Sequence, residues 1–212
     1  MKIKRFEFNM FPVNCYVLAD ESCETAIIDA GCYYKEEQQR LKEFVEGNKL
    51  TVKHLLNTHL HADHQFGNAF AAREFGVKPE ASQRDEFLLA GLATFCKSFG
   101  FPINEAPEPL GHCITDGEII RFGETELEAI SVPGHSPGGM VFYCKKERCL
   151  FSGDTLFKGS IGRADLEGGN FDDLRESIAT KLFVLPDDTV VYPGHGNETT
   201  IGYEKMNNPF FR

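Results

Sequence analysis

The sequence predicts an α/β (α+β) protein in which two β-sheets pack together and helices cover their outer faces. Three observations predict this fold class. Short apolar segments with strand-like alternation occur in both halves of the chain, each half also contains helical spacing, and the segment order is strands, helices, strands, helix, strand. A sheet that is apolar on one face must bury that face against another layer, so two such halves form a layered sandwich.

The first half of the chain begins with strands and continues with helices. Helical spacing is found over residues 34–46, where Gly47 gives the stop, and over residues 65–75 and about 82–99. A proline-rich loop follows the last of these helices. The predicted strands of this half, which show alternation or short apolar runs between turn residues, are Lys2–Phe8, Cys15–Ala19, Ala26–Asp29 and Val52–Leu56.

The second half returns to strand patterning. Asp172–Leu182 has helical spacing and precedes the last strand. The predicted strands are Ile119–Phe122, Thr125–Val132, Met140–Tyr143, Cys149–Ser152 and Thr189–Tyr192. The 212 residues contain no internal repeat or Pro/Gly/Ser-rich linker, and 42% of them are hydrophobic, so we expect residues 1–212 to form a single domain.

The net charge and the cysteine content limit which binding partners and which cellular compartment we expect for the protein. The formal net charge is −10, which disfavours nucleic acid as a partner because phosphate binding needs a basic face. The N-terminus has no apolar signal-peptide core, and no apolar stretch approaches the roughly 18 residues that span a bilayer. The seven cysteines show no CxxC spacing. We therefore expect a cytoplasmic protein with reduced thiols and no membrane partner.

The most informative motif is Thr-His-Leu-His-Ala-Asp-His at residues 58–64, which directly follows a predicted strand. Imidazole and carboxylate groups are the usual ligands of zinc and similar divalent cations. A single short loop brings several of them together with little loss of chain entropy. We therefore predict that His59, His61, Asp63 and His64 are metal ligands.

Three further candidate ligands follow predicted strands in the second half. His135 lies in Pro-Gly-His-Ser-Pro-Gly, Asp154 in Gly-Asp-Thr, and His195 in Pro-Gly-His-Gly. Glycine permits the tight turns that point a side chain inward from a strand end, and loops at one edge of a sheet commonly carry reactive groups. The remaining histidines, His54 and His112, are expected to be ordinary surface or hydrogen-bonded residues.

The order of these motifs resembles the metallo-β-lactamase superfamily over the whole chain. That resemblance implies an αββα sandwich of two mixed β-sheets with metal ions at one edge. Gly153–Phe157 and Pro193–Gly196 are similar to the glyoxalase II (hydroxyacylglutathione hydrolase) branch. Gly159–Asp165 and the ending from Glu204 to Phe210 resemble the short bacterial members of that branch, which have no C-terminal helical domain.

The superfamily resemblance also implies how the ligands are shared between two divalent ions, with zinc expected and iron or manganese as alternatives. His59, His61 and His135 would hold one ion, Asp63, His64 and His195 would hold the other, and Asp154 would bridge both. Asp29 would steady the ligand loops by hydrogen bonding, although a plain turn residue at a strand end is the other interpretation.

The glyoxalase II resemblance implies a small-molecule substrate, a thioester such as S-lactoylglutathione. Metal binding lowers the pKa of a water towards about 7, so that hydroxide can attack the carbonyl carbon. Asp63 and Asp154 are the expected catalytic carboxylates, since Asp63 can orient the hydroxide. A thiolate, whose conjugate acid has a pKa of about 8.5, departs with little proton donation.

Substrate binding is predicted from the same resemblance. Arg163 occupies the position of the basic residue that holds the glycine carboxylate of glutathione, and Lys158 is a second candidate. The family places a tyrosine two residues later, where this chain has Asp165, which we expect to pair with Arg163. Without a C-terminal domain, we expect any glutathione site to be either partial or rebuilt from residues 82–110.

Two other function classes compete with the hydrolase. Persulfide dioxygenases share the fold and a similar Gly-Arg-x-Asp stretch, and they hold a single iron at the positions of His59, His135 and Asp154. A metal-stabilised binding protein without turnover would need a closed ligand set with no open position. β-Lactamase and lactonase activities also occur in the superfamily, whereas nuclease activity is disfavoured by the acidic charge.

Overall fold

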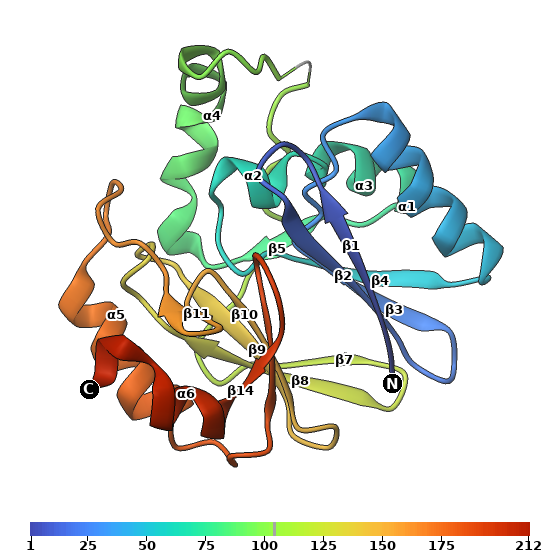
Figure 1. The fold of residues 1–212 in the computed structure, drawn as a ribbon. Coiled ribbons are helices and arrows are strands. Elements are labelled where there is room, and N and C mark those ends of the chain that lie inside the picture. Colours follow the sequence, from blue (N-terminus) through green and yellow to red (C-terminus); the bar gives the residue numbers. More distant parts are fainter. Residues whose placement is uncertain (104) are drawn as a thin grey trace.

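Two six-stranded β-sheets lie face to face in the computed structural model, which describes residues 1–103 and 105–212 (Figure 1). In spatial order, the first sheet consists of β1 (Lys2–Phe8), β2 (Val13–Ala19), β3 (Glu24–Ile28), β4 (Thr51–Leu56), β5 (Pro79–Ala81) and β6 (His112–Cys113). The second sheet consists of β14 (Thr199–Thr200), β13 (Val190–Pro193), β10 (Cys149–Gly153), β9 (Met140–Cys144), β8 (Thr125–Ser131) and β7 (Ile119–Phe122). A separate ribbon is formed by β11 (Leu156–Phe157) and β12 (Ser160–Ile161).

Helices lie between the strands in the sequence of both halves of the chain. They are α1 (Lys35–Gly47), α2 (Ala62–Gln65), α3 (Asn68–Phe75), α4 (Phe87–Ser98), α5 (Phe171–Ser177) and α6 (Ile201–Asn207). Three shorter turns of helix complete the set: the 3₁₀ turns η1 (Gln83–Asp85) and η3 (Pro209–Phe211), and the π-type turn η2 (Ile178–Leu182), which continues α5.

Both sheets are mixed, as the sequence predicts. The pairs β1–β2 and β2–β3 are antiparallel, whereas β3–β4, β4–β5 and β5–β6 are parallel. In the second sheet only the β10–β13 pair is parallel among the pairs described. Parallel neighbours end at the same edge of their sheet, so the loops that follow β3, β4, β10 and β13 can gather side chains there.

Strand alternation in β2 shows how one strand serves two layers. Tyr16 and Leu18 face the second sheet, while Cys15 and Val17 face outward under the helices. The layer between the sheets is apolar and fully buried, and its largest members are Leu18, Ile28, Leu56, Phe122, Leu127, Phe142 and Phe151. Burial of these side chains stabilises the sandwich by about 1.5–3 kcal/mol each.

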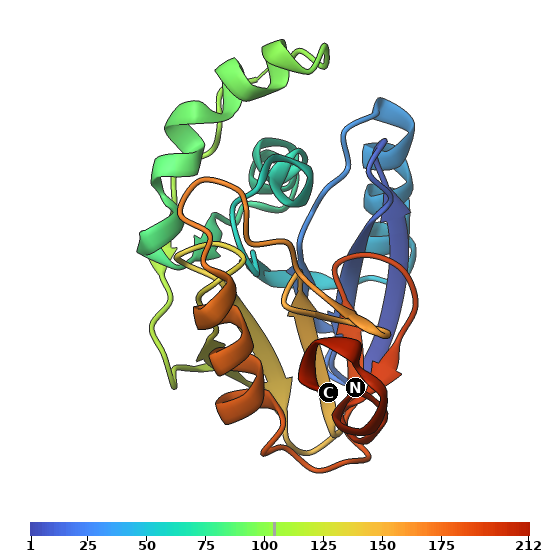
Figure 2. The same cartoon turned by 60° about the vertical axis from the view of Figure 1, so that its left-hand side comes forward.

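Helices cover the two outer faces. Leu41 and Val45 of α1 pack with Phe70 of α3 on the first sheet, and Leu174 of α5 packs with Ile201 of α6 on the second. Figure 2 shows α1 and α5 on opposite sides of the strands. The result is an αββα sandwich, which is the architecture expected from the sequence. Within residues 1–103 and 105–212, no helix has the length and apolarity needed to cross a bilayer.

The predicted helices differ in detail from the observed ones. The helix expected over residues 65–75 is interrupted because the N–H of Gly67 donates to the carbonyl of Ala30 at 2.7 Å and leaves the helical ladder. The helix expected over residues 82–99 is divided into η1 and α4, and the one over 172–182 changes from α to π geometry. Short elements of two to seven residues were not predicted, namely β5, β6, β11, β12, β14, α2, α6 and η3.

Candidate metal centre

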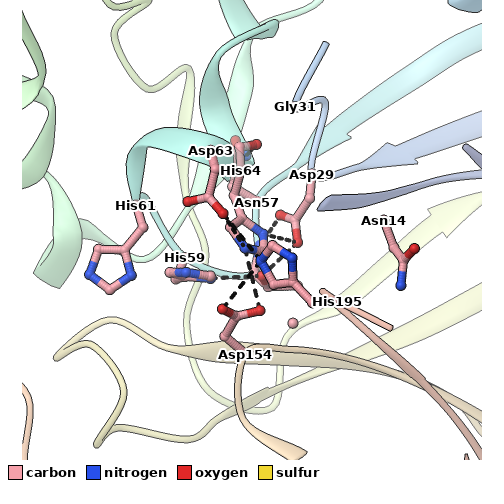
Figure 3. A network of polar contacts seen from close by, with 12 residues as sticks. Asn14, Asp29, Gly31, Asn57, His59, His61, Asp63, His64, Asp154 and His195 are labelled. Carbon is pink, nitrogen blue, oxygen red and sulfur yellow. Dashed lines mark hydrogen bonds and ion pairs between the residues drawn. The ribbon is translucent and has the colours of Figure 1, made fainter. Parts of the chain in front are cut away.

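All seven predicted ligands lie at one edge of the sandwich, in loops that follow strands. His59 and His61 follow β4, and Asp63 and His64 belong to the short helix α2. The second sheet contributes the other three, because His135 lies between β8 and β9, Asp154 follows β10 and His195 follows β13. Figure 3 shows Asp154 facing the rings of His64 and His195, with Asp63 above them.

The ligand atoms form three overlapping groups. Within each group, one donor atom from every residue lies within 4.8 Å of the others. The groups are His59–His61–His135, His59–His64–Asp154 and Asp63–His64–His195. The first and the third contain the same residues as the two ligand sets that the superfamily resemblance implies, and Asp154 lies in the group that connects them.

In the first group, hydrogen bonds to the Nδ1 atoms of His59 and His135 leave the Nε2 lone pairs of these two rings free. The Nδ1 of His135 is 2.7 Å from the carbonyl of Arg163, so it must carry the hydrogen. The hydroxyl of Thr58 donates to Asp29 at 2.7 Å and accepts from the Nδ1 of His59 at 3.1 Å. In the neutral imidazoles, both Nε2 atoms are therefore bare acceptors.

These bare atoms face each other across a short gap. The Nε2 of His135 is 3.2 Å from the Nε2 of His59 and 2.9 Å from the Nδ1 of His61. Two acceptor lone pairs at this separation repel each other unless a cation lies between them. The chemistry and geometry of the three nitrogens therefore fit a divalent ion such as zinc.

In the second group, too, the Nδ1 atoms of the histidines face hydrogen-bond acceptors outside the cluster, and their Nε2 atoms face inward. The Nδ1 of His64 donates to Asp29 at 2.9 Å, and the Nδ1 of His195 lies 3.2 Å from the carbonyl of Pro12. The Nε2 of His64 lies 3.4 Å from Asp154 and has no hydrogen-bond partner, and the same is true of Asp154 Oδ1 among the described residues. Buried polar atoms without partners are costly, so a cation-binding function explains them.

The pKa shifts within the cluster also indicate that it would stabilise a cation. Burial alone would lower the pKa of His64, but the carboxylates of Asp63 and Asp154 raise it well above its ordinary value. Burial opposes ionisation of Asp154, yet the nearby imidazole of His64 lowers the pKa of this carboxyl below its usual range. Burial and the neighbouring His135 lower the pKa of His61 to about 4. A cation would therefore meet neutral rings on one side and carboxylates on the other.

Asp29 connects the strand ends to this cluster. Its carboxylate accepts hydrogen bonds from the N–H of Thr58 at 2.8 Å, the hydroxyl of Thr58 and the Nδ1 of His64. Its backbone has a φ of 53°, a left-handed conformation that aspartate tolerates better than most residues. The side chain thus fixes the orientation of His64 and of the loop that begins at Thr58, without lying in any of the three donor groups.

Comparison with known proteins identifies the family. The model of the metallo-β-lactamase superfamily matches residues 9–195, a range that contains all seven clustered ligands. The chain belongs to the metallo-β-lactamase superfamily.

Relatives of similar length are found within this superfamily. The hydroxyacylglutathione hydrolase GloC of Haemophilus influenzae is 37% identical over 99% of this chain and 98% of its own length. The structure of the BLEG-1 B3 metallo-β-lactamase has a TM-score of 0.88 and 34% identity, covering 99% of both chains. The protein TTHA1623 in a di-iron-bound form has a TM-score of 0.85 and 30% identity, covering 98% of this chain and 99% of its own.

The two residues predicted to bind substrate lie outside the metal cluster of this superfamily member. The Arg163 guanidinium is exposed and donates two parallel hydrogen bonds to Asp165, both at 2.7 Å. Lys158 is exposed in the turn between β11 and β12. His54 bonds to the side chain of Glu80, away from the cluster, and His112 bonds to that of Glu118.

Several polar residues that support the site were not identified from the sequence. Pro193, at the base of the His195 loop, accepts hydrogen bonds from the Asn14 amide at 2.9 Å and from the Tyr16 hydroxyl at 2.7 Å. The Asn57 amide donates to the carbonyl of His64 at 3.0 Å. The sequence signal that could have identified these residues is a polar side chain within or next to an apolar strand, because a buried amide or hydroxyl needs a hydrogen-bond partner.

Proposed function

We propose that the chain is a binuclear metallo-hydrolase that cleaves a thioester, with S-lactoylglutathione or a related glutathione thioester as substrate. The observation that carries the proposal is the convergence of bare imidazole nitrogens with two carboxylates at one sheet edge. Likeness to a relative named hydroxyacylglutathione hydrolase supports the thioester, and likeness to a di-iron-bound protein supports two ions.

The three donor groups support a division of ligands between the ions. His59, His61 and His135 would hold one ion, Asp63, His64 and His195 would hold the other, and Asp154 would offer its carboxylate to both. Zinc suits this set of nitrogen and oxygen donors, and iron or manganese can occupy it where they are more available. When bound, the ions lower the pKa of a shared water towards about 7 and polarise the scissile carbonyl.

Asp63 is the residue that orients the attacking water. Its side chain is 19% exposed on α2, whereas His64 beside it is fully buried, so Asp63 can reach a water at the opening of the site. Its Oδ2 lies 3.1 Å from the Nε2 of His195. The other carboxylate oxygen accepts a hydrogen bond from the water and aligns it with the carbonyl carbon.

The reaction also requires that the thiolate departs and that the substrate carboxylate is bound. A thiolate leaves without a strong acid because the pKa of its conjugate acid is about 8.5. Arg163 binds the substrate carboxylate by exchanging Asp165 for it, and exposed pairs of this kind are weak enough for exchange. Lys158 on the neighbouring turn adds positive charge for an anionic substrate.

The test combines metal analysis with turnover. We expect protein purified without chelators to contain about two metal ions per chain and to release thiol from S-lactoylglutathione. Asp154→Asn should lower both the metal content and the turnover, because it removes the bridging carboxylate. Turnover that survives complete removal of metal would contradict the proposal.

Two alternative activities give distinct results in the same experiments. A single iron per chain together with oxygen uptake on glutathione persulfide would identify a dioxygenase. Hydrolysis of a chromogenic cephalosporin, tested because of the likeness to the BLEG-1 β-lactamase, would identify a lactamase if the thioester is left intact.

A further inference from the structure

A fully buried carboxylate lies beside the candidate metal centre without belonging to it. Asp85 is the last residue of η1, between β5 and α4, and its exposed fraction is 0%. A buried carboxylate is costly unless it is hydrogen-bonded, so its partners indicate what it does.

Its partners are two of the loops that carry proposed metal ligands. Asp85 Oδ2 accepts from the N–H of Leu60 at 3.2 Å and from the hydroxyl of Ser136 at 2.8 Å. Asp85 Oδ1 accepts from the N–H of Gly138 at 2.6 Å. Leu60 lies between His59 and His61 in the chain, and Ser136 directly follows His135. One carboxylate therefore joins the loop after β4 to the loop between β8 and β9, and so joins the two sheets.

The fit of the second loop on this carboxylate is close. A Cβ atom at Gly138 would lie 2.6 Å from Asp85 Oδ1 and 2.7 Å from its Cγ. Contacts this short do not occur, so the loop approaches the carboxylate as closely as it does only because residue 138 is glycine. Leu60 and Ser136, which donate two of the hydrogen bonds, are themselves fully buried, so water does not compete for these bonds.

Asp85 and Asp29 have complementary positions. Asp29 bonds directly to His64, a member of the second donor group. The hydrogen bonds of Asp85 go only to the loops of the first group, within the part of the chain that the structure describes. The three nitrogens of that group come from these two loops, and their spacing depends on how the loops are held together.

We propose that Asp85 is a positioning residue that holds His59, His61 and His135 at the spacing needed to bind one of the two metal ions. The inference rests on the proposed function, because it assigns a role toward one ion of the binuclear centre. Residues that orient ligands in this way typically contribute about 10- to 100-fold to metal affinity.

The experiment is a competitive titration of metal-free protein with zinc and a chromophoric chelator. Asp85→Asn keeps the size of the side chain but places an NH₂ group against at least one N–H or O–H donor. We expect it to weaken one of the two zinc sites by about 10- to 100-fold and to change the other by less than about threefold. Ser136→Ala, which removes one of the three donors, should weaken the same site to a smaller extent, and it tests the inference if Asp85→Asn does not fold.

Asp20→Asn is the matched control. Asp20 is 9% exposed and also accepts three hydrogen bonds from loops of both sheets, namely from Ser22, Glu124 and Thr125. β2 begins at Val13, which pairs with His195 beside the metal cluster, and ends at Ala19. Asp20 directly follows Ala19 and therefore lies at the far end of this strand from the cluster. If replacing any buried, hydrogen-bonded aspartate weakened zinc binding, this variant would show the same weakening. We expect its zinc affinities to equal those of the wild type.

The outcomes separate the two proposals. Unchanged zinc affinities in Asp85→Asn, equal weakening of both sites, or the same loss in Asp20→Asn would overturn the role of Asp85. A wild-type protein that binds two zinc ions but does not hydrolyse thioesters would overturn the proposed substrate only, and the titration would still measure the effect of Asp85.

Discussion

At the scale of single residues, the cluster depends on backbone that approaches the ligands closely. A Cβ atom at Gly194 would lie 2.3 Å from Asp154 Oδ1 and 2.7 Å from the Cε1 of His64. We expect Gly194→Ala to displace the carboxylate of Asp154, which we propose as the bridging ligand, and to lower metal affinity and turnover by at least about tenfold. Metal content by elemental analysis and thiol release measure the two effects.

Gly196 in the same turn provides the control for this prediction. Its φ is 74°, so alanine is strained there, but a Cβ would meet no atom of residues 1–103 or 105–212 within 4 Å. Gly196→Ala should therefore reduce stability slightly and leave metal binding intact. Equal loss of metal in both variants would show that strain in the turn, and not the contact with Asp154, is responsible.

If Arg163 binds the substrate carboxylate as proposed, its pair with Asp165 sets how well an anionic substrate competes for the guanidinium. Asp165→Asn removes the internal partner, so Arg163 is free to bind a substrate carboxylate. We expect the KM for S-lactoylglutathione to fall by about two- to fivefold with kcat nearly unchanged, because the pair is exposed and weak. The fall should diminish at high salt. A change in kcat alone would contradict a role in substrate binding.

At the scale of elements, Asp20 connects the end of β2 to the β7–β8 hairpin and so ties the two sheets together. Its carboxylate accepts from the N–H of Ser22 and Glu124 and from the hydroxyl of Thr125. The backbone hydrogen bond from Ser22 is the main cause that lowers the pKa of Asp20 from 3.8 to about 2. The folded protein therefore holds fewer protons on this group than the unfolded chain at intermediate pH.

The sign of the pH dependence follows from this lowered pKa. The stabilisation is complete above the unfolded pKa of 3.8 and is lost as the pH falls through about 2. We expect wild type to exceed Asp20→Asn in the urea midpoint at about pH 5 to 7, and the difference to shrink below pH 3.8. Measurement with chelator present removes the contribution of metal loss. A difference that is constant down to about pH 2.5 would contradict the assignment.

The longer strands were predictable because periodicity and burial agree in them. Lys2–Phe8 and Ile119–Phe122 have the predicted bounds, since alternate residues really do face a buried layer. Short elements carry too few residues for a period: β5 has three and includes Pro79. The break before α3 depends on the approach of Gly67 to Ala30, a contact between distant segments that local pattern does not encode.

At the scale of the whole molecule, the sequence could single out the side chains that cluster because histidines and aspartates of ligand type are dense at residues 59–64 and sit beside turn residues elsewhere. The cluster that these side chains form requires the sandwich, since four come from the first sheet and three from the second. Asp85 was not identifiable in this way. In Ser-Gln-Arg-Asp-Glu-Phe it is one charged residue among several, and only the folded chain shows that it is buried between two loops.

Ligands drawn from both sheets make metal binding a link between the halves of the protein. His61 precedes α2 on the first sheet side, whereas His135 belongs to the second, and their ring nitrogens are 2.9 Å apart. Without a cation, the bare Nε2 lone pairs of His59, from the first sheet, and His135, from the second, repel each other at a separation of 3.2 Å. An ion that binds only the folded state must then stabilise it by mass action.

We therefore expect the melting temperature to rise with zinc and to fall with a chelator. Free zinc at about 1,000 times its Kd adds about 4 kcal/mol for one site, which corresponds to about 8–16 °C for a chain of this length. Differential scanning calorimetry of the metal-free and zinc-loaded protein measures the shift. Asp154→Asn should lose most of this shift, because the Asp154 carboxylate, the proposed bridging ligand, lies near rings from both sheets, His64 at 3.4 Å and His195 at 3.6 Å. An equal shift in that variant would mean that zinc stabilises the protein at some other place, and that the two sheets are not joined through this centre.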